Sequence, residues 1–373
     1  MIDFVKFATA MRARIFIYFS IVFVMHVNTC YANKTDSVEI DYQVYLEPYY
    51  FPYSNTIGKL SEGFLFNYTE KKGVSINLAM AMLQAKGERS RASFGLMAGT
   101  YSRDNLFSEA DWAKPIFEAS AGIKLSKNQN FWLDAGVFQS HIGYEWAIGF
   151  DCMMLSRSMA AENSPYYESG IKLSHISLSG KTEFEILLLN GWQRISPLNN
   201  KVRPATGHRF TWKPNNKMSL TSSSFAGDGS TNEDTYLRFF HHFNMQYQLN
   251  ERWKLIASFD YGTQQKKPKS IKYSSWWNNT LCLEYAFSNQ IKLKCRQEFF
   301  NDPSRVIISD LLSEKVFLNS ISLGIDYQFD KASMLRFEWR RFGKTNSAFN
   351  QLFNESNRTN TLLLSLAVKL KSD

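Results

Sequence analysis

The sequence has too few cysteines for a disulfide-stabilised fold, and beyond its first residues it lacks apolar runs long enough for membrane helices. Of its four cysteines, Cys152, Cys282 and Cys295 follow the N-terminal segment, and this odd, widely spaced set fits neither a disulfide framework nor a zinc pattern. Although 44% of the residues are hydrophobic, no later stretch stays apolar for the roughly eighteen residues that a membrane helix requires. These absences exclude a disulfide-rich secreted domain and a helical membrane protein.

Sequence patterns typical of catalysis or cofactor binding are also missing. There is no glycine-rich phosphate loop and no cysteine pair, so we expect no nucleotide, cofactor or metal ion. His241 and His242 are adjacent, and neighbours on a strand point to opposite faces, so they cannot chelate one metal ion together. No histidine after the N-terminal segment lies in a serine or carboxylate pattern typical of a hydrolase. We therefore expect the chain not to be an enzyme.

The first 32 residues read as a secretory signal peptide. Three basic residues precede an apolar stretch over residues 15–27, which is too short to span a bilayer. Residues 30–32 then fit a small-x-small cleavage site, which leaves residues 33–373 as the mature chain. A short N-terminal membrane anchor and a lipoprotein signal are the weaker alternatives.

The basic charge balance does not indicate a nucleic-acid partner in this context. Removal of the signal segment takes three basic residues and one acidic residue with it, so the net charge falls from +9 to +7. A basic balance is compatible with nucleic-acid binding in general, but an exported chain does not ordinarily meet nucleic acid. We expect no nucleic-acid partner.

The feature that dominates the mature chain is period-two alternation of apolar and polar residues, which predicts β-strands. In the seven most regular stretches every charged residue lies on the face opposite the apolar one. These stretches are 237–249, 253–262, 276–287, 291–300, 317–329, 334–340 and 362–371. The apolar face carries aromatic residues at its ends, and Trp253 to Tyr261 spans roughly 20 Å of height when tilted by about 40°. This is close to the ~25 Å lipid-facing band of an outer-membrane barrel, with its aromatic girdles.

The connections between the predicted strands alternate strictly between short and long. Short periplasmic turns and long outer loops are typical of transmembrane barrels. We predict sixteen strands in one antiparallel up-and-down barrel, near residues 38–50, 73–86, 89–101, 116–126, 130–140, 165–178, 181–192, 205–214, 217–227, 236–249, 252–265, 274–288, 291–302, 316–329, 333–343 and 359–371. The even count places both termini on the periplasmic side, and the mature chain is a single domain.

Several longer runs of the sequence resemble the OmpL-like β-barrel porin family of Bacteroidetes. They are GER at 87–89, LMAGTY at 96–101, WLDAGVF at 132–138, SHIG at 140–143, AAENSPY at 160–166 and LNGWQR at 189–194. The resemblance covers most of the mature chain, and the block 131–194 is its most specific part. It implies an outer-membrane channel of a Gram-negative bacterium and supplies no catalytic residues.

The longest connection, residues 141–164, is the strongest candidate for a functional loop. In sixteen-stranded general porins the third loop folds into the lumen and sets the pore constriction. By analogy, Glu145, Arg157 and Glu162 are candidates for the wall of such a constriction, where opposed charges select solutes. The alternative is an ordinary surface loop packed on the rim by its own aromatic residues, and the sequence leaves both open.

The lumen-facing charges of the seven regular strands are the second group of candidate pore-lining residues. The basic candidates are Arg238, Lys254, Lys292, Lys294, Arg296, Arg336 and Arg340, followed by Lys369 and Lys371 in the last strand. Five acidic residues lie on the same faces, so the excess of four positive charges predicts a mild preference for anions. The alternative is a solvated wall whose charges pair across strands.

The sequence favours a porin-like channel for passive diffusion of small hydrophilic solutes through a water-filled lumen. The alternative function is a closed barrel that serves as a surface binding, adhesion or structural protein. The expected partners are outer-membrane lipid, the solutes and the barrel-assembly machinery, and a homo-oligomer is compatible with the sequence. We also expect arginine to be tolerated at the lumen-facing Ser322 and Asn244, but not at the lipid-facing Leu323 and Phe243.

Overall fold

The computed structural model describes residues 38–55, 64–71, 73–196, 204–229, 234–308, 316–344 and 358–372. The expected signal peptide, residues 1–32, lies outside the described residues. Residues 40–373 form one compact unit, which is built almost entirely of β-strands. In the part of the chain that is described, no helix has both the length and the apolar character needed to cross a membrane.

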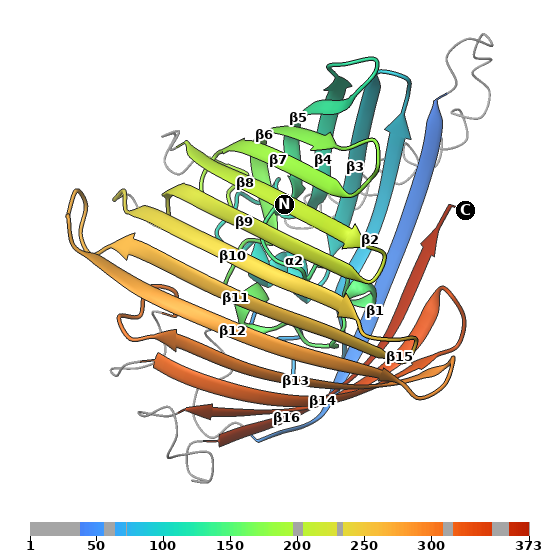
Figure 1. Ribbon diagram of the computed structural model, residues 1–373. Helices are drawn as coiled ribbons and strands as arrows, with labels where there is room; N and C mark the ends of the chain where they lie inside the picture. The colour runs from blue at the N-terminus through green and yellow to red at the C-terminus, as the bar shows by residue number, and fades with distance from the viewer. Residues whose placement is uncertain are drawn as a thin grey trace, which may run out of the picture. The chain divides into compact units, whose positions relative to one another are not determined.

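Sixteen antiparallel strands follow one another in chain order around a closed barrel, and β16 pairs with β1 to close it (Figure 1). The strands are β1 (Glu39–Asn55), β2 (Val74–Lys86), β3 (Ser90–Ala98), β4 (Ile116–Lys124), β5 (Asn130–Gln139), β6 (Tyr167–Ile176), β7 (Thr182–Leu189), β8 (Ala205–Asn215), β9 (Met218–Asp228), β10 (Leu237–Gln248), β11 (Trp253–Gln265), β12 (Tyr273–Ala286), β13 (Ile291–Asp302), β14 (Val316–Gln328), β15 (Ser333–Lys344) and β16 (Arg358–Lys371). The predicted fold class and strand count are confirmed.

In the described part of the chain, three short helical segments lie in the connections between strands. They are α2 (Thr100–Asn105), the 3₁₀ helix η2 (Gly149–Asp151) and α3 (Met159–Glu162). The connections alternate in length as predicted, because turns of two to five residues join β2 to β3, β4 to β5 and so on, whereas the others are longer. All three helical segments belong to long connections.

Alternation along each strand separates an outward apolar face from an inward polar face. The register of β10 on β11 places Phe243 opposite Phe259, and both side chains are exposed on the outside of the barrel. The next pair, Asn244 and Ser258, points inward and is buried. Because the side-chain period of a strand is two, this register fixes the face of every residue in both strands.

Aromatic residues mark both ends of the outward apolar face. Toward the short turns, the rings of Trp253 and Tyr285 lie 4.6 Å apart between centroids. Toward the long connections, Tyr261 pairs with Trp277 across β11 and β12. Such rings at two levels are the aromatic girdles that lie at the two lipid–water interfaces of a membrane barrel.

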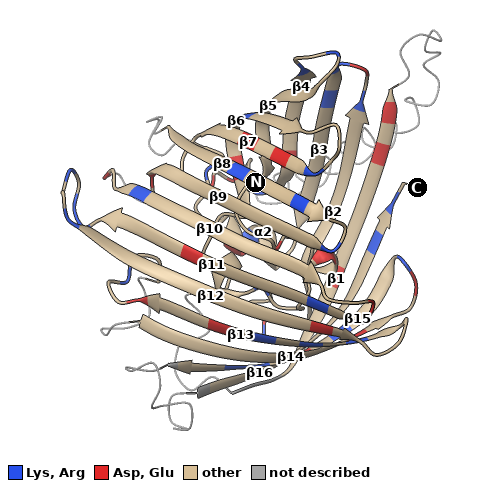
Figure 2. Cartoon of the chain, in the orientation of Figure 1, with Lys and Arg blue, Asp and Glu red and all other residues tan. Residues whose placement is uncertain are grey.

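The interior of the barrel is packed with side chains. Figure 2 shows that the strands carry both basic and acidic residues, and the inward ones are mostly buried. Large apolar side chains also point inward, among them Leu78, Phe225 and Trp276, and together with residues of the long connections they form buried clusters. Ser322 and Asn244 do point inward as predicted, but they are 0% and 1% exposed. The expectation that these two positions accept arginine was therefore wrong, since the space in front of them is filled.

Candidate functional site

The connection between β5 and β6, residues 140–166, folds into the barrel and is called the inner loop below. It enters beside Gly207 of β8, where a β-carbon would collide with the imidazole of His141. Nε2 of His141 lies 2.8 Å from the carbonyl oxygen of Ser224, and burial lowers the pKa of this histidine to about 4. The neutral ring therefore donates this hydrogen bond and anchors the start of the inner loop.

Arg336 of β15 holds the middle of the inner loop through backbone carbonyls. Its guanidinium donates to the carbonyl oxygens of Gly149 (2.6 Å), Cys152 (3.0 Å) and Met153 (2.9 Å), and to Asp326 of β14 at 3.0 Å. Because an arginine carries five donor hydrogens in a planar fork, one side chain can satisfy several carbonyls at once. The inner loop is thus fixed at η2 and the residues that follow it.

Ser156 is the second point at which the inner loop is attached to the wall. Its carbonyl oxygen and hydroxyl accept hydrogen bonds from Arg296 of β13 at 2.7 and 2.8 Å. Its backbone N–H and its hydroxyl donate to Glu338 of β15, both at 2.7 Å. Arg340 donates to the same hydroxyl and, at 2.8 Å, to the carbonyl oxygen of Arg157. The loop therefore spans from one wall of the barrel to the facing one.

The wall residues that hold the inner loop also neutralise each other. Glu298 lies 3.0 Å from Arg296 and 2.6 Å from Arg340, and all three side chains are buried. A buried charge without a partner is strongly unfavourable, whereas a paired and hydrogen-bonded one is tolerated. The buried Arg296 and Arg340 are thus held in ion pairs with glutamates of β13 and β15, which explains how several charges fit inside the barrel.

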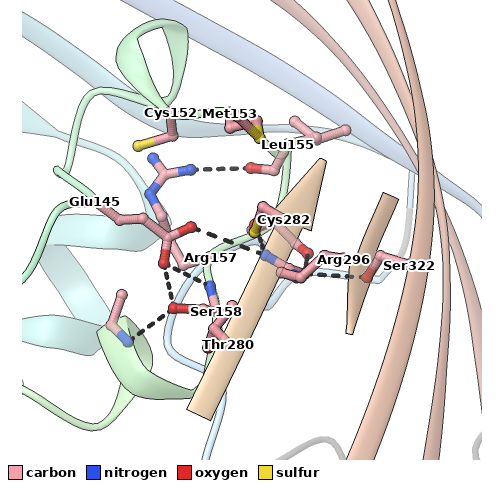
Figure 3. A network of polar contacts seen from close by, with 12 residues as sticks. Glu145, Cys152, Met153, Leu155, Arg157, Ser158, Thr280, Cys282, Arg296 and Ser322 are labelled. Atoms are coloured by element: carbon pink, nitrogen blue, oxygen red, sulfur yellow. Dashed lines mark hydrogen bonds and ion pairs between the residues drawn. The ribbon is translucent and has the colours of Figure 1, made fainter. Parts of the chain in front are cut away.

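Arg157 organises the inner loop from within (Figure 3). It is 0% exposed and donates to the carbonyl oxygens of Trp146 (2.7 Å), Leu155 (2.9 Å) and Ala147 (3.0 Å). These carbonyls belong to two segments of the loop that run past each other. Arg157 therefore closes the inner loop on itself, as a compact unit.

Glu145 and Ser158 join the first part of the inner loop to α3, which lies within the same loop (Figure 3). Glu145 accepts hydrogen bonds from the backbone N–H and the hydroxyl of Ser158, and it lies 3.9 Å from Arg296. Ser158 in turn caps α3, because its hydroxyl accepts from the N–H of Ala161 at 3.1 Å. Burial raises the pKa of Glu145.

Glu162 at the end of α3 joins the inner loop to residues 64–71 of the first long connection. Its carboxyl group accepts hydrogen bonds from the backbone N–H of Phe66 at 2.6 Å and from the side-chain amide of Asn67 at 3.1 Å. Burial raises the pKa of Glu162 to about 7, although Arg157 and Arg340 both act to lower it. The charge of this carboxyl group therefore changes close to neutral pH.

The structure buries most of the residues predicted to line a pore. Eight of them are at most 7% exposed: Glu145, Arg157, Glu162, Arg238, Lys294, Arg296, Arg336 and Arg340. Lys254 and Lys292 remain partly exposed. Except for Arg238 and Lys254, these residues lie in or beside the network that holds the inner loop. Whether they line a conducting path stays a prediction.

Arg238 and Lys254 lie apart from this network. Arg238 is held by Gln264, to which it donates at 2.9 and 2.6 Å, and its guanidinium packs on the rings of Trp192 and Trp276. Lys254 lies toward the short turns and contributes to a hollow near β7 to β11 that includes Lys181. The sequence grouped these residues with the others because they share the inward face.

Sequence reasoning missed the residues of the N-terminal half that hold the inner loop. Tyr45 of β1 accepts a hydrogen bond from the N–H of Phe150 at 3.1 Å, and Arg209 of β8 donates to the carbonyl oxygen of His141 at 2.8 Å. The hydroxyl of Tyr68 lies 2.9 Å from the carboxylate of Glu47 and 3.1 Å from the carbonyl oxygen of Leu155. The alternation could have placed Tyr45 and Arg209 inward, but it carries no signal for contacts with backbone carbonyls of a distant loop.

Two cavities of the barrel differ in their position and their lining. One of about 320 Å³ opens toward the long connections and is lined by Phe51, Phe107, Phe342 and neighbouring polar residues. The other, of about 280 Å³, lies toward the short turns against β2 to β7 and is lined mainly by polar side chains, including Lys172 and Glu185. Ser156 and Glu162 of the inner loop line the first cavity, whereas residues of β2 to β7 line the second.

Comparison with solved structures shows that the fold is that of porins. The anion-selective porin of Comamonas acidovorans superposes with a TM-score of 0.58 at 10% identity, over 90% of this chain and all of that one. OmpF of Salmonella typhi, solved in complex with daunomycin, superposes with a TM-score of 0.57 at 10% identity, over 91% of this chain and 99% of that one. OmpT of Vibrio cholerae superposes with a TM-score of 0.56 at 8% identity, over 91% of this chain and 99% of that one.

Sequence comparison gives the family. Among curated proteins no sequence matches. One family model, described as "Putative beta-barrel porin-2, OmpL-like", matches residues 39–370, which is nearly the whole barrel. Together with the closed sixteen-stranded barrel, this match shows that the chain belongs to the OmpL-like β-barrel porin-2 family.

Proposed function

We propose that the chain is an outer-membrane channel through which small hydrophilic solutes diffuse passively, with the inner loop as its constriction. The observation that carries the proposal is the attachment of the inner loop across the barrel by Arg296, Arg336 and Arg340. A sixteen-stranded barrel leaves an aqueous lumen unless something fills it, and a loop fixed at mid-height narrows that lumen. Membership of a porin family supports the same conclusion.

We also propose a mild preference for anions. The partly exposed Lys254 and Lys292 on the inward face, together with the positive charge excess of the strands, support it. The buried arginines add little, because Asp326, Glu298 and Glu338 neutralise them. The preference should therefore be weak and should decrease as salt screens the exposed lysines.

A closed barrel that binds a partner at its surface is the second candidate function. One observation favours it: apolar clusters fill much of the interior, with Tyr101 and Leu106 of the second long connection packed against Leu78 of β2. A lumen sealed in this way would conduct no ions. The two candidates therefore differ in a property that one measurement can separate.

Conductance of the purified protein in a planar lipid bilayer under a salt gradient tests the proposal. Discrete conductance steps support a channel, and a reversal potential shifted toward that of the anion supports the selectivity. A folded barrel, identified by its heat-modifiable mobility on a gel, that gives no steps would contradict the channel and favour the surface-binding protein.

A further inference from the structure

The hairpin that joins β11 to β12 ends in a dense group of lysines. Residues 266–272, called the lysine hairpin below, include four lysines, and all four are exposed: Lys266, Lys267, Lys269 and Lys272. Figure 2 shows this tip as a basic loop that projects beyond the strands. It lies at the end of the barrel that carries the long connections.

Within the part of the chain that the structure describes, none of these lysines has an acidic partner. The sequence contains no aspartate or glutamate between Asp260 and Glu284. Among the described residues, the ion pairs of the barrel involve other lysines, such as Lys294 with Asp326 and Lys369 with Asp151. The lysine hairpin therefore presents uncompensated positive charge to its surroundings.

The lysine hairpin continues directly from the aromatic girdle of the lipid-facing surface. Lys272 precedes Tyr273, whose ring lies 6.2 Å from that of Phe239 on the outside of β10. The N–H of Lys266 donates to the carbonyl oxygen of Lys272 at 3.0 Å, so the two arms of the hairpin are still paired at this level. Along the strands Tyr273 lies beyond the girdle residues Tyr261 and Trp277, and Lys272 follows Tyr273 by one further residue, about 3.3 Å of strand. That is the level of lipid headgroups.

An apolar side chain accompanies the lysines at the tip. Ile271 is 93% exposed, two residues beyond Tyr273 along the outward side of β12. An isolated isoleucine in water is unfavourable, whereas at a bilayer surface it can contact the acyl–headgroup boundary. Basic residues around an exposed apolar residue are typical of segments that lie on anionic membranes.

The turn of the lysine hairpin holds Lys269 in a backbone conformation that favours glycine. The N–H of Ser270 donates to the carbonyl oxygen of Lys267 at 3.0 Å, and Pro268 occupies the second position of this turn. Lys269 at the third position has a φ of 59°, a conformation that glycine adopts without strain and lysine does not. Replacement of Lys269 by glycine would therefore remove one charge and relieve the turn at the same time.

We propose that the lysine hairpin binds the phosphate groups of anionic lipids in the leaflet that surrounds the long connections. Four ammonium groups and one apolar contact at headgroup level match the charge and the depth of such lipids. The consequence is that β11 and β12, the pair that carries this hairpin, are anchored against movement normal to the membrane. The proposal is independent of whether the barrel conducts.

The test is binding of phosphatidylglycerol to the purified full-length chain in neutral detergent, counted by native mass spectrometry, with phosphatidylcholine as the neutral comparison. The decisive variant is Lys269→Gly, which removes one charge and relieves the turn strain. We expect about fivefold weaker phosphatidylglycerol binding, since one basic residue near an anionic surface contributes about 1 kcal/mol. Thermal stability should stay the same or increase.

A matched pair of four-lysine variants separates this site from the effect of net charge. Replacement of all four lysines of the lysine hairpin by glutamine should abolish preferential binding of phosphatidylglycerol. The same replacement at Lys181, Lys213, Lys217 and Lys254, toward the short turns, should leave it unchanged. Equal losses in both variants would overturn the proposal, as would displacement of the lipid by an equal concentration of inorganic phosphate.

Discussion

Arg336 and Glu162 are the two residues on which the position of the inner loop most depends. Arg336 is 0% exposed and satisfies three loop carbonyls together with Asp326. Glu162 connects the inner loop to Phe66 and Asn67, and burial raises its pKa. One residue thus fixes the loop through a permanent charge and the other through a carboxyl group that titrates.

Replacement of Arg336 by glutamine should release the inner loop. The change leaves three carbonyls without their donor and leaves Asp326 with Lys294 as its remaining basic partner, so we expect a loss of about 3–5 kcal/mol in the free energy of unfolding, as for other broken buried ion pairs. Urea unfolding in lipid vesicles measures it. Arg341→Gln is the control, because Arg341 lies next to Arg340 but faces outward. An equal loss in both variants would contradict the assigned role.

Conductance should rise as the pH increases through 7 if Glu162 holds the inner loop in place. In the docked loop the carboxyl group has a pKa of about 7, whereas in water it is near 4.5. Between these values the docked state binds more protons, so docking is favoured at low pH and weakened as the pH rises. Single-channel recordings from pH 5 to 8 should show this increase, and Glu162→Gln, which mimics the protonated form, should abolish it. A wild type without pH dependence would contradict the role of Glu162.

The strands could be predicted closely from the sequence, whereas the contacts that attach the inner loop to the wall could not. Period-two alternation assigns Arg296, Arg336 and Arg340 to the inward face, because a residue's face depends only on its position along the strand. Their actual partners are backbone carbonyls of residues more than a hundred positions away, such as Gly149. Any loop sequence offers such carbonyls, so no residue pattern marks them. The entry of the loop follows from three-dimensional packing.

The same limitation explains the wrong expectation for Ser322 and Asn244. Their inward orientation follows from the strand period, but the sequence does not reveal that the hydroxyl of Ser322 contacts Arg296 in a filled interior. Tolerance of a larger residue depends on free space as well as on the face. A valid comparison therefore needs an inward position that borders a cavity.

Ile171 and Ser174 of β6 provide that comparison. Ile171 is 47% exposed on the outside of the barrel, whereas Ser174 lines the 280 Å³ cavity together with Glu183 and Glu185. Ile171→Arg should prevent stable insertion, since an arginine at the bilayer midplane costs ~2–4 kcal/mol. Ser174→Arg should fold, because its charge meets water and two carboxylates. Heat-modifiable mobility after refolding into vesicles reports the outcome, and equal behaviour of both variants would contradict the assignment of the faces.

For the whole molecule, we propose that the inner loop limits the aqueous path through the barrel. The barrel itself is closed by the pairing of β16 with β1, and its sixteen strands need no loop for closure. The loop attaches at separate points on β1, β8, β13 and β15. Removing it should therefore widen the lumen without opening the sheet, although the buried charges of the wall would then face water.

The most direct measurement is a comparison of single-channel conductance between the wild type and a variant in which residues 147–157 are replaced by a short glycine–serine linker. The wild type should give small discrete steps, and the variant should give larger ones with weaker solute selectivity. Steps of the same size would show that the inner loop does not limit the pore. Two folded barrels that both fail to conduct would contradict the channel itself.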